Sequence, residues 1–274
     1  ASAGMAMLSH ANHRLGKLDV ARKHAQDALV LARQLHNSWV QPEAVLAAAN
    51  CETDLGFYEE AIANYNIARE LAMMVGKLQN QFLPAMNIGL CHTFMGNHRQ
   101  AVEVLTTIIK EMESLNILRL TAPAKLYLGL AYEGLQEWDA ATQAYEAASK
   151  VRRSFIASPT LFDSLAGEMR VAIQQGRDNV ARKHLQEITN HLNQHGWEGI
   201  EYPIKVKLSV AKAYEHFNDQ PAYEMHIRRA HTLLQNNASM IADPASRHSY
   251  LHNVPFAIEV QNRFANINAK ARQQ

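Results

Sequence analysis

The chain has little of what disulfide-stabilised and membrane proteins depend on. It holds two cysteines among 274 residues, Cys51 and Cys91, and neither belongs to a CxxC pair. We therefore expect no disulfide framework and a reducing compartment, with the cytoplasm as the default location. No run of residues approaches the ~20 apolar positions that a membrane-spanning helix needs, so no contact with a membrane is expected.

An excess of charge of one sign is missing too. The 27 Lys and Arg residues and 26 Asp and Glu residues give a formal net charge of +1. The chain therefore lacks the basic character by which proteins bind nucleic acids. It also contains no GxxxxGK[ST] or GxGxxG phosphate loop and no GxSxG nucleophile elbow. We expect neither an enzyme nor a bound cofactor.

Histidine, a common metal ligand, is plentiful in this chain, with 14 residues. His191 and His195 are spaced four residues apart on one predicted helix face, and His184 lies about two turns earlier. Zinc can use such a set with a fourth ligand. Because no HExxH motif or cysteine ligand accompanies these histidines, a surface helix is the preferred interpretation, and no metal site is expected.

What the sequence does contain is an internal repeat of 40 residues. Its anchors are Gly16, Gly56, Gly96 and Gly176, with Gln136 in the fourth copy and Asn218, two residues late, in the sixth. Small residues recur seven positions before the anchor, and alanine recurs five positions after it. The positions +5, +9 and +12 lie on one face of a helix. The repeat therefore predicts pairs of antiparallel helices that approach closely and stack on copies of themselves.

The anchor itself predicts the turn that ends the first helix of each pair. Glycine takes the left-handed conformation of such a turn at little cost, and Asn218 tolerates it as well. Gln136 is less suited, and Gly134 indicates a turn that is shifted by two residues in that repeat. Five prolines fall where first helices should begin, where a missing N–H does no harm: Pro42, Pro84, Pro123, Pro159 and Pro203.

The two cysteines share one place in the repeat, five residues before an anchor. The other copies have alanine or valine there, for example Ala131 and Val171. A buried cysteine packs like a small apolar residue. We therefore predict packing roles for Cys51 and Cys91 rather than a redox pair.

This pattern resembles the tetratricopeptide repeat (TPR): small at −7, glycine at 0, aromatic near +2, alanine at +5 and small at +12. Tyr58 and Trp138 fill the aromatic position at +2, and Tyr132 and Tyr214 fill another at −4. The usual period is about 34 residues. The longer unit resembles the extended repeats in the sensor regions of bacterial signal-transduction (STAND) ATPases and of LuxR- and AfsR-type regulators. The resemblance implies an all-α, TPR-like α-solenoid with six helix-turn-helix repeats over residues 1–237, wound into a right-handed superhelix.

Residues 238–274 break the repeat. The run from Arg247 through Ser249, Leu251 and Asn253 to Pro255 resembles the closing segment of the same regulators. The last repeat of a solenoid exposes an apolar flank that needs a cover. We therefore expect a C-terminal capping helix here, followed by a polar tail from residue 266.

The resemblance also implies where a ligand binds. In such arrays the first helices line a concave groove, and ligands contact positions −13, −10, −6 and −3 from the anchor. Carried over to this sequence, the candidate ligand-binding residues are Leu46, Asn50, Thr53, Leu83, Met86, Leu90, Leu126, Leu130, Glu133, Arg170, Lys205 and Lys212. The middle of this groove is apolar, and its C-terminal end is basic. It suits a peptide or protein ligand with an acidic end, although the leucines and Met86 could equally pack between repeats.

Two functions fit these features. One is a non-enzymatic sensor module of a multidomain bacterial signalling protein, which binds a peptide, a protein or an inducer and signals to an effector or ATPase domain elsewhere in the chain. The other is a constitutive protein–protein interaction scaffold that does not switch. An enzyme or metal protein is the third and least favoured class.

Overall fold

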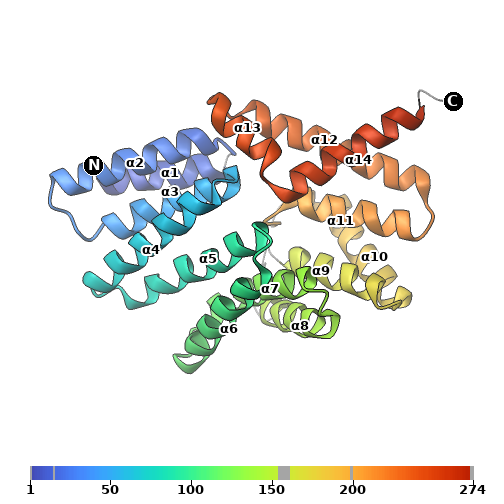
Figure 1. The fold of residues 1–274 in the computed structure, drawn as a ribbon, viewed down its shortest axis with the longest axis horizontal. Coiled ribbons are helices and arrows are strands. Elements are labelled where there is room, and N and C mark those ends of the chain that lie inside the picture. Colours follow the sequence, from blue (N-terminus) through green and yellow to red (C-terminus); the bar gives the residue numbers. More distant parts are fainter. Residues whose placement is uncertain (1, 15, 154–160, 198–199, 272–274) are drawn as a thin grey trace. The chain divides into compact units, whose positions relative to one another are not determined.

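A computed structural model describes residues 2–14, 16–153, 161–197 and 200–271 of the chain. These residues form fourteen α-helices and one short 3-10 helix (Figure 1). The first six α-helices are α1 (Ser2–Arg14), α2 (Leu18–Gln34), α3 (Gln41–Leu55), α4 (Tyr58–Met74), α5 (Phe82–Phe94) and α6 (His98–Ser114), and η1 (Leu78–Gln81) precedes α5. The next six are α7 (Leu118–Gly134), α8 (Trp138–Arg153), α9 (Leu161–Gln174), α10 (Asp178–His195), α11 (Pro203–His216) and α12 (Gln220–Ser239). Two more close the chain, α13 (Pro244–His252) and α14 (Pro255–Ala271).

The chain forms two compact units. The first comprises Ala1–Val104 with Gln235–Pro255, and the second comprises Leu105–Leu234 with Phe256–Gln274. Within the first unit α1 packs on α2 and α3 on α4, and within the second α7 packs on α8 and α9 on α10. The predicted all-α solenoid of six helix-turn-helix repeats is confirmed.

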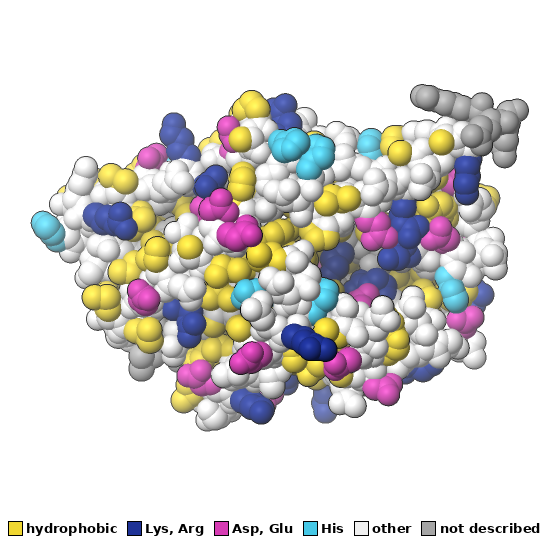
Figure 2. Space-filling view, viewed as in Figure 1, with side chains coloured by type: hydrophobic (Ala, Val, Ile, Leu, Met, Phe, Trp, Pro, Cys, Tyr) yellow, Lys and Arg dark blue, Asp and Glu magenta, His cyan; other side chains and the backbone are white. Residues whose placement is uncertain are grey.

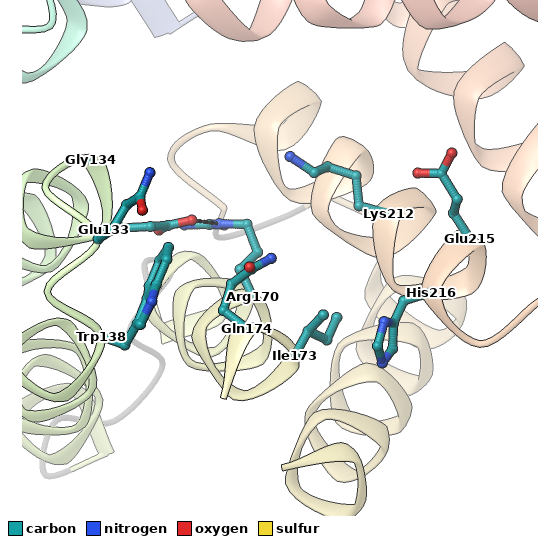
Figure 3. A pocket seen from close by; sticks show the side chains of 10 residues that line it. Glu133, Gly134, Trp138, Arg170, Ile173, Gln174, Lys212, Glu215 and His216 are labelled. Carbon is teal, nitrogen blue, oxygen red and sulfur yellow. Dashed lines mark hydrogen bonds and ion pairs between the residues drawn. The ribbon is translucent and has the colours of Figure 1, made fainter. Parts of the chain in front are cut away.

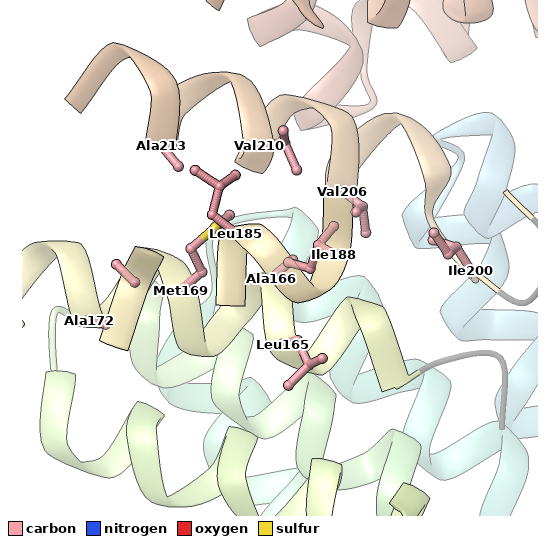
Figure 4. Packing of buried hydrophobic residues seen from close by; sticks show 11 residues of the cluster. Leu165, Ala166, Met169, Ala172, Leu185, Ile188, Ile200, Val206, Val210 and Ala213 are labelled. Carbon is pink, nitrogen blue, oxygen red and sulfur yellow. The ribbon is translucent and has the colours of Figure 1, made fainter. Parts of the chain in front are cut away.

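The predicted packing positions are confirmed in every repeat. All residues at −7, +5, +9 and +12 from the six anchors are buried. Figure 4 shows this packing in the second unit, where Met169 of α9, Leu185 and Ile188 of α10 and Val210 of α11 meet in one cluster. Cys51 and Cys91 are unpaired and fully buried, as the packing interpretation expects.

All six anchors adopt the left-handed conformation. The φ angles are 74° at Gly16, 83° at Gly56, 80° at Gly96, 60° at Gln136, 68° at Gly176 and 60° at Asn218. The expected shift of the fourth turn to Gly134 is therefore wrong, since Gly134 is the last residue of α7. The same hydrogen bond closes this turn as the others: Glu137 N donates to Tyr132 O at 3.0 Å, as Phe57 N donates to Glu52 O at 2.8 Å. That bond offsets the cost of a side chain in this conformation.

A second series of left-handed residues marks the turns between repeats. Its members are His36, Asn116, Gly76 and Gly196, with φ angles between 50° and 74°, and each lies 20 residues after an anchor. The prolines follow the expectation with one exception. Pro42 and Pro203 start α3 and α11, but Pro123 lies inside α7, because that helix already begins at Leu118. Pro159 lies outside the described residues.

The segment after residue 238 forms two helices. The carboxylate of Asp19 in α2 accepts hydrogen bonds from the backbone N–H groups of Ala242 (2.7 Å) and Asp243 (3.0 Å), just before α13. Asn253 lies against Gly56, where an added Cβ would be 2.9 Å from the Asn253 Cβ. The region predicted to be a polar tail is instead part of α14 up to Ala271, and it buries Ile267.

The surface carries charge of both signs. Figure 2 shows Lys and Arg side chains interspersed with Asp and Glu side chains over the face it presents. None of the described helices is long and apolar enough to cross a lipid bilayer.

Tyr145 of α8 lies against two helical glycines in the second unit. An added Cβ at Gly129 of α7 would lie 2.6 Å from the ring of Tyr145, and one at Gly167 of α9 would lie 2.4 Å from it. Such distances are shorter than any normal contact. The two glycines therefore let the ring fill the space between α7 and α9, where a methyl group would already overpack the site.

We predict that Gly129→Ala lowers the free energy of unfolding by about 1–3 kcal/mol, because overpacking outweighs the better helix propensity of alanine. The matched control is Gly4→Ala in α1, where an added Cβ meets nothing within 4 Å. That variant should be as stable as the parent or slightly more stable. Chemical denaturation measures both, and a Gly129→Ala variant as stable as the parent would contradict the argument.

Candidate functional site

The first helices of the second unit bring six of the candidate residues together. α7 supplies three of them, α9 one and α11 two, and α9 packs on both α7 and α11. The six residues are Leu126, Leu130, Glu133, Arg170, Lys205 and Lys212. All of them line one or both of two pockets on this surface.

A partly buried ion pair between Glu133 and Arg170 lies at the centre of this surface. Arg170 donates from Nε to Glu133 Oε1 at 2.7 Å and from Nη2 to Oε2 at 2.8 Å. The Tyr145 hydroxyl donates to the same carboxylate at 2.6 Å, and Arg170 Nη1 donates to Ser209 Oγ of α11 at 2.8 Å. Figure 3 shows the two charged side chains reaching toward each other from α7 and α9. This two-bond geometry is the strongest form of an arginine–carboxylate contact.

The pair holds both of its charges. Burial by itself would raise the pKa of Glu133, but the Arg170 guanidinium and the hydrogen bonds to the carboxylate lower that pKa to about 2. The pKa of Arg170 is raised in turn, because the Glu133 carboxylate outweighs the effect of burial. As a result, Arg170 is not the available cation that the sequence suggested. Its charge is already matched inside the protein.

The two lysines of α11 differ from each other. Lys212 Nζ lies 3.1 Å from Glu259 Oε1 of α14, and both side chains are more than a third exposed, so this pair contributes little. Lys205 is half-buried and forms no ion pair among the described residues. Burial, followed by the nearby charge of Arg170, lowers the pKa of Lys205 to about 7.

The larger pocket has a volume of about 600 Å³, within the range of ligand sites in proteins. Its lining comes from α7, α8, α9, α11 and the turn at the fourth anchor, and consists of Glu133, Gly134, Gln136, Trp138, Arg170, Ile173, Gln174, Lys212, Glu215 and His216. Ile173 and Glu215 occupy the same −3 position as Glu133, so the positional rule covers them. The rule misses the other five lining residues, which lie within two positions of an anchor: Gly134, Gln136, Trp138, Gln174 and His216.

The smaller pocket lies toward the beginning of the same helices. Its volume is about 10 Å³, space for one water-sized group. It is lined by Leu126, Leu130, Asp163, Ala166, Arg170, Tyr202, Lys205 and Val206. Asp163 is buried, and its two carboxylate oxygens accept hydrogen bonds from the backbone N–H groups of Glu201 (2.9 Å) and Tyr202 (3.0 Å). The hydrogen-bond partners of Asp163 are therefore groups of the protein itself.

The candidate residues of the first unit form a separate group. Asn50 Oδ1 accepts hydrogen bonds from the Tyr65 hydroxyl at 2.8 Å and from Asn87 Nδ2 at 3.0 Å. Thr53 Oγ1 lies 2.9 Å from the same hydroxyl. Tyr65 holds the +9 position of its repeat, as Tyr145 does two repeats later. In both repeats this tyrosine hydrogen-bonds the polar residue at −3, a role that the sequence analysis missed although the aromatic at +9 was visible.

Burial favours packing for several apolar candidates. The exposed fraction is 4% for Met86, 2% for Leu90, 3% for Leu126 and 8% for Leu130, and Thr53 is buried as well. Leu46 is partly buried and packs against the cluster that contains Tyr65, and Leu83 is half-buried. The alternative that these side chains pack between repeats therefore fits most of the apolar set.

The histidines of α10 have other neighbours. His184 Nε2 lies 3.2 Å from Glu168 Oε2, and the ring of His191 stacks on Phe162 at 3.8 Å between centroids. Over the described part of the chain, no group of three or more His, Cys, Asp or Glu residues has the geometry of a metal site.

Comparison with known proteins identifies the fold. No family model and no curated protein matches the chain. Among solved structures, a Rap protein complexed with Competence and Sporulation Factor is similar with a TM-score of 0.70 and 15% identity, over 98% of this chain and 76% of that one. NprR in complex with its cognate peptide NprX gives a TM-score of 0.60 and 11% identity, over 82% and 64% of the two chains. The thermophilic TPR protein TTC0263 of Thermus thermophilus gives a TM-score of 0.56 and 19% identity, over 78% and 100%. These similarities show that the chain has a TPR-like helical fold.

Proposed function

We propose that this chain is a binding protein that takes a peptide, or an extended segment of another protein, into the larger pocket. The observation that carries the proposal is the pocket itself, about 600 Å³ in volume, whose lining includes residues of α7, α9 and α11 at the −3 and −6 positions that the TPR resemblance assigns to ligand contacts. Two of the similar structures, the Rap protein and NprR, are complexes with a factor and with a cognate peptide.

The chemistry of the lining suits a peptide backbone. Gln136 and Gln174 present amide groups that can donate and accept hydrogen bonds, and Trp138 and Ile173 present apolar surface. The charged lining residues are largely matched inside the protein, since Arg170 pairs with Glu133 and Glu215 pairs with Arg263 at 2.7 Å. A pocket of this kind orients a ligand through amides and apolar contacts, and its action is binding without catalysis.

We further propose that binding here is a sensing event in a larger signalling protein, with an effector or ATPase domain in the same chain. The run from Arg247 to Pro255, which resembles the closing segment of bacterial signal-transduction ATPases and LuxR-type regulators, supports this context. The two buried, unpaired cysteines are compatible with the cytoplasm. A constitutive scaffold that binds a protein partner without switching is the second candidate, and it uses the same pocket.

Filling the larger pocket should weaken binding. Peptides would be selected from an unbiased dodecamer library on the parent protein, and their dissociation constants measured by fluorescence anisotropy. We expect Gln174→Trp to weaken the selected peptides at least ~10-fold, because the indole occupies the volume that a ligand side chain needs. Gln186→Trp, on the exposed face of α10 and outside both pockets, is the matched control and should bind with unchanged affinity. Equal affinities for the two variants would place the ligand elsewhere.

The Glu133–Arg170 pair should act as a rigid wall of this pocket, and its loss should show in stability. We expect Glu133→Gln to lower the free energy of unfolding by about 3–5 kcal/mol at pH 7, because Arg170 is left buried without its anionic partner. A double variant, Glu133→Gln with Arg170→Met, should be more stable than the single one.

The same pair predicts a pH dependence. The pKa of Glu133 is lowered to about 2, so its stabilising contribution is present above the pKa of an unfolded glutamate and is lost as the pH falls toward 2. Urea unfolding between pH 5 and pH 2 should therefore show a steeper loss for the parent than for Glu133→Gln. Parallel curves would contradict a charged, buried pair.

The sensor and the scaffold differ in what the ligand does to the array. A sensor selects one conformation on binding, whereas a scaffold does not need to. We expect small-angle scattering of the parent protein to change on saturation with a selected peptide, and to stay unchanged when Gln174→Trp receives the same peptide. An identical scattering curve for the free and the saturated parent would favour the scaffold.

A further inference from the structure

Lys205 differs from every other charged group around the two pockets. The charges of Arg170 and Asp163 are satisfied by Glu133 and by backbone N–H groups, and Lys212 has Glu259. Lys205 lines the smaller pocket, is half-buried, and forms no ion pair with any residue that the structure describes. A partly buried ammonium without a partner is costly, so an arriving anion would relieve that cost.

We propose that Lys205 binds a carboxylate of the bound peptide, and that one oxygen of this carboxylate enters the smaller pocket. This inference rests on the proposed function and adds to it the chemical class of the ligand. The pocket has space for one water-sized group, which fits a single carboxylate oxygen in place of a water molecule. Its walls also include the Asp163 carboxylate, whose oxygens accept hydrogen bonds from backbone N–H groups just before α11, and the apolar side chains of Leu126 and Val206, which limit the access of water to the new ion pair.

Lys205 lies within reach of the larger pocket. Arg170 lines both pockets, so a peptide lying along the first helices can place its body in one and its carboxylate in the other. Arg170 itself donates to Glu133, Tyr145 and Ser209, so its donors are used within the protein and Lys205 supplies the charge for the ligand. The acidic end that the sequence suggested for the ligand is thereby assigned to one residue.

The charges around Lys205 make this binding depend on pH. From α9 it faces Arg170 and Asp163, from α7 Glu133, and from the segment before α11 Glu201. Burial and the charge of Arg170 lower the pKa of Lys205 to about 7, against the opposite effect of the three carboxylates. A carboxylate that binds beside Lys205 raises this pKa, so binding takes up a proton at pH values between 7 and the raised pKa of the bound state. Affinity should therefore be highest below pH 7 and fall by up to about tenfold per pH unit above it.

The test uses the peptides selected from the dodecamer library on the full chain. Each is resynthesised with its C-terminal carboxylate amidated, or with one Asp or Glu at a time changed to the corresponding amide. Dissociation constants are measured from pH 5.5 to pH 8.5 on the parent, on Lys205→Met, and on Lys183→Met, an exposed lysine of α10 outside both pockets. The two peptide series distinguish a terminal carboxylate from a side-chain carboxylate.

We expect Lys205→Met to weaken the acidic peptide at least ~30-fold at pH 6 and to remove the fall in affinity above pH 7. Lys183→Met should behave as the parent, and one of the amide changes should reproduce the effect of Lys205→Met. If the peptides bind but Lys205→Met has the parent's affinity and pH profile, this inference is wrong and the proposed function stands. If no peptide is bound by the parent at any pH, the proposed function fails and the inference with it.

Discussion

Close approach of helices through small side chains is the constraint on which this structure depends. Alanine, glycine or serine at −7 and alanine at +5 remove the side-chain volume that would keep two helices apart. The larger residues at +9 then enter the gap between neighbouring first helices. Tyr145 shows how tight this packing is, since its ring lies where a Cβ on Gly129 or Gly167 would be. The hydroxyl of that tyrosine thereby reaches the Glu133 carboxylate. The place of the ion pair at the pocket therefore depends on how closely α7, α8 and α9 pack.

The sequence predicted the parts of the fold that recur and was less accurate where one copy departs from the others. Anchors, hairpins and buried positions follow from the repeat, because each copy must pack on the next. Gln136 was misjudged, because residue preference for the left-handed conformation is weaker than the hydrogen bond that closes the turn. The turns between repeats were missed, although Gly76 and Gly196 lie 20 residues after their anchors. The C-terminal segment has no second copy, so its pattern could not show that α13 lies on the first unit while α14 belongs to the second.

For the candidate site, the sequence predicted which residues come together in the second unit and could not say which of them are available. Glu133 and Arg170 are 37 residues apart, and two other side-chain hydrogen bonds, from Asn80 to Glu43 and from Asn87 to Asn50, have the same separation. On the first helices, Asn50 and Glu133 therefore each face the residue 37 positions later, whereas Arg170 donates to Ser209, 39 positions later. This register was hidden in the sequence because it differs from the period of 40 by one turn of helix. With it, Arg170 would have been recognised as the partner of Glu133, which leaves Lys205 as the candidate cation that forms no ion pair within the described part of the chain.

The two units place different chemistry at equivalent positions. In the second repeat the +9 tyrosine hydrogen-bonds neutral side chains, Asn50 and Thr53, whereas in the fourth it hydrogen-bonds Glu133, which Arg170 neutralises. Both tyrosines are fully buried, but Tyr145 lies against Gly129 and Gly167, whereas Tyr65 belongs to a cluster with Ala49 and Cys91. The residue at −3 can therefore change from Thr53 to Glu133 while the tyrosine at +9 stays fully buried. The fold places no constraint on such polar positions beyond the need to satisfy each buried group.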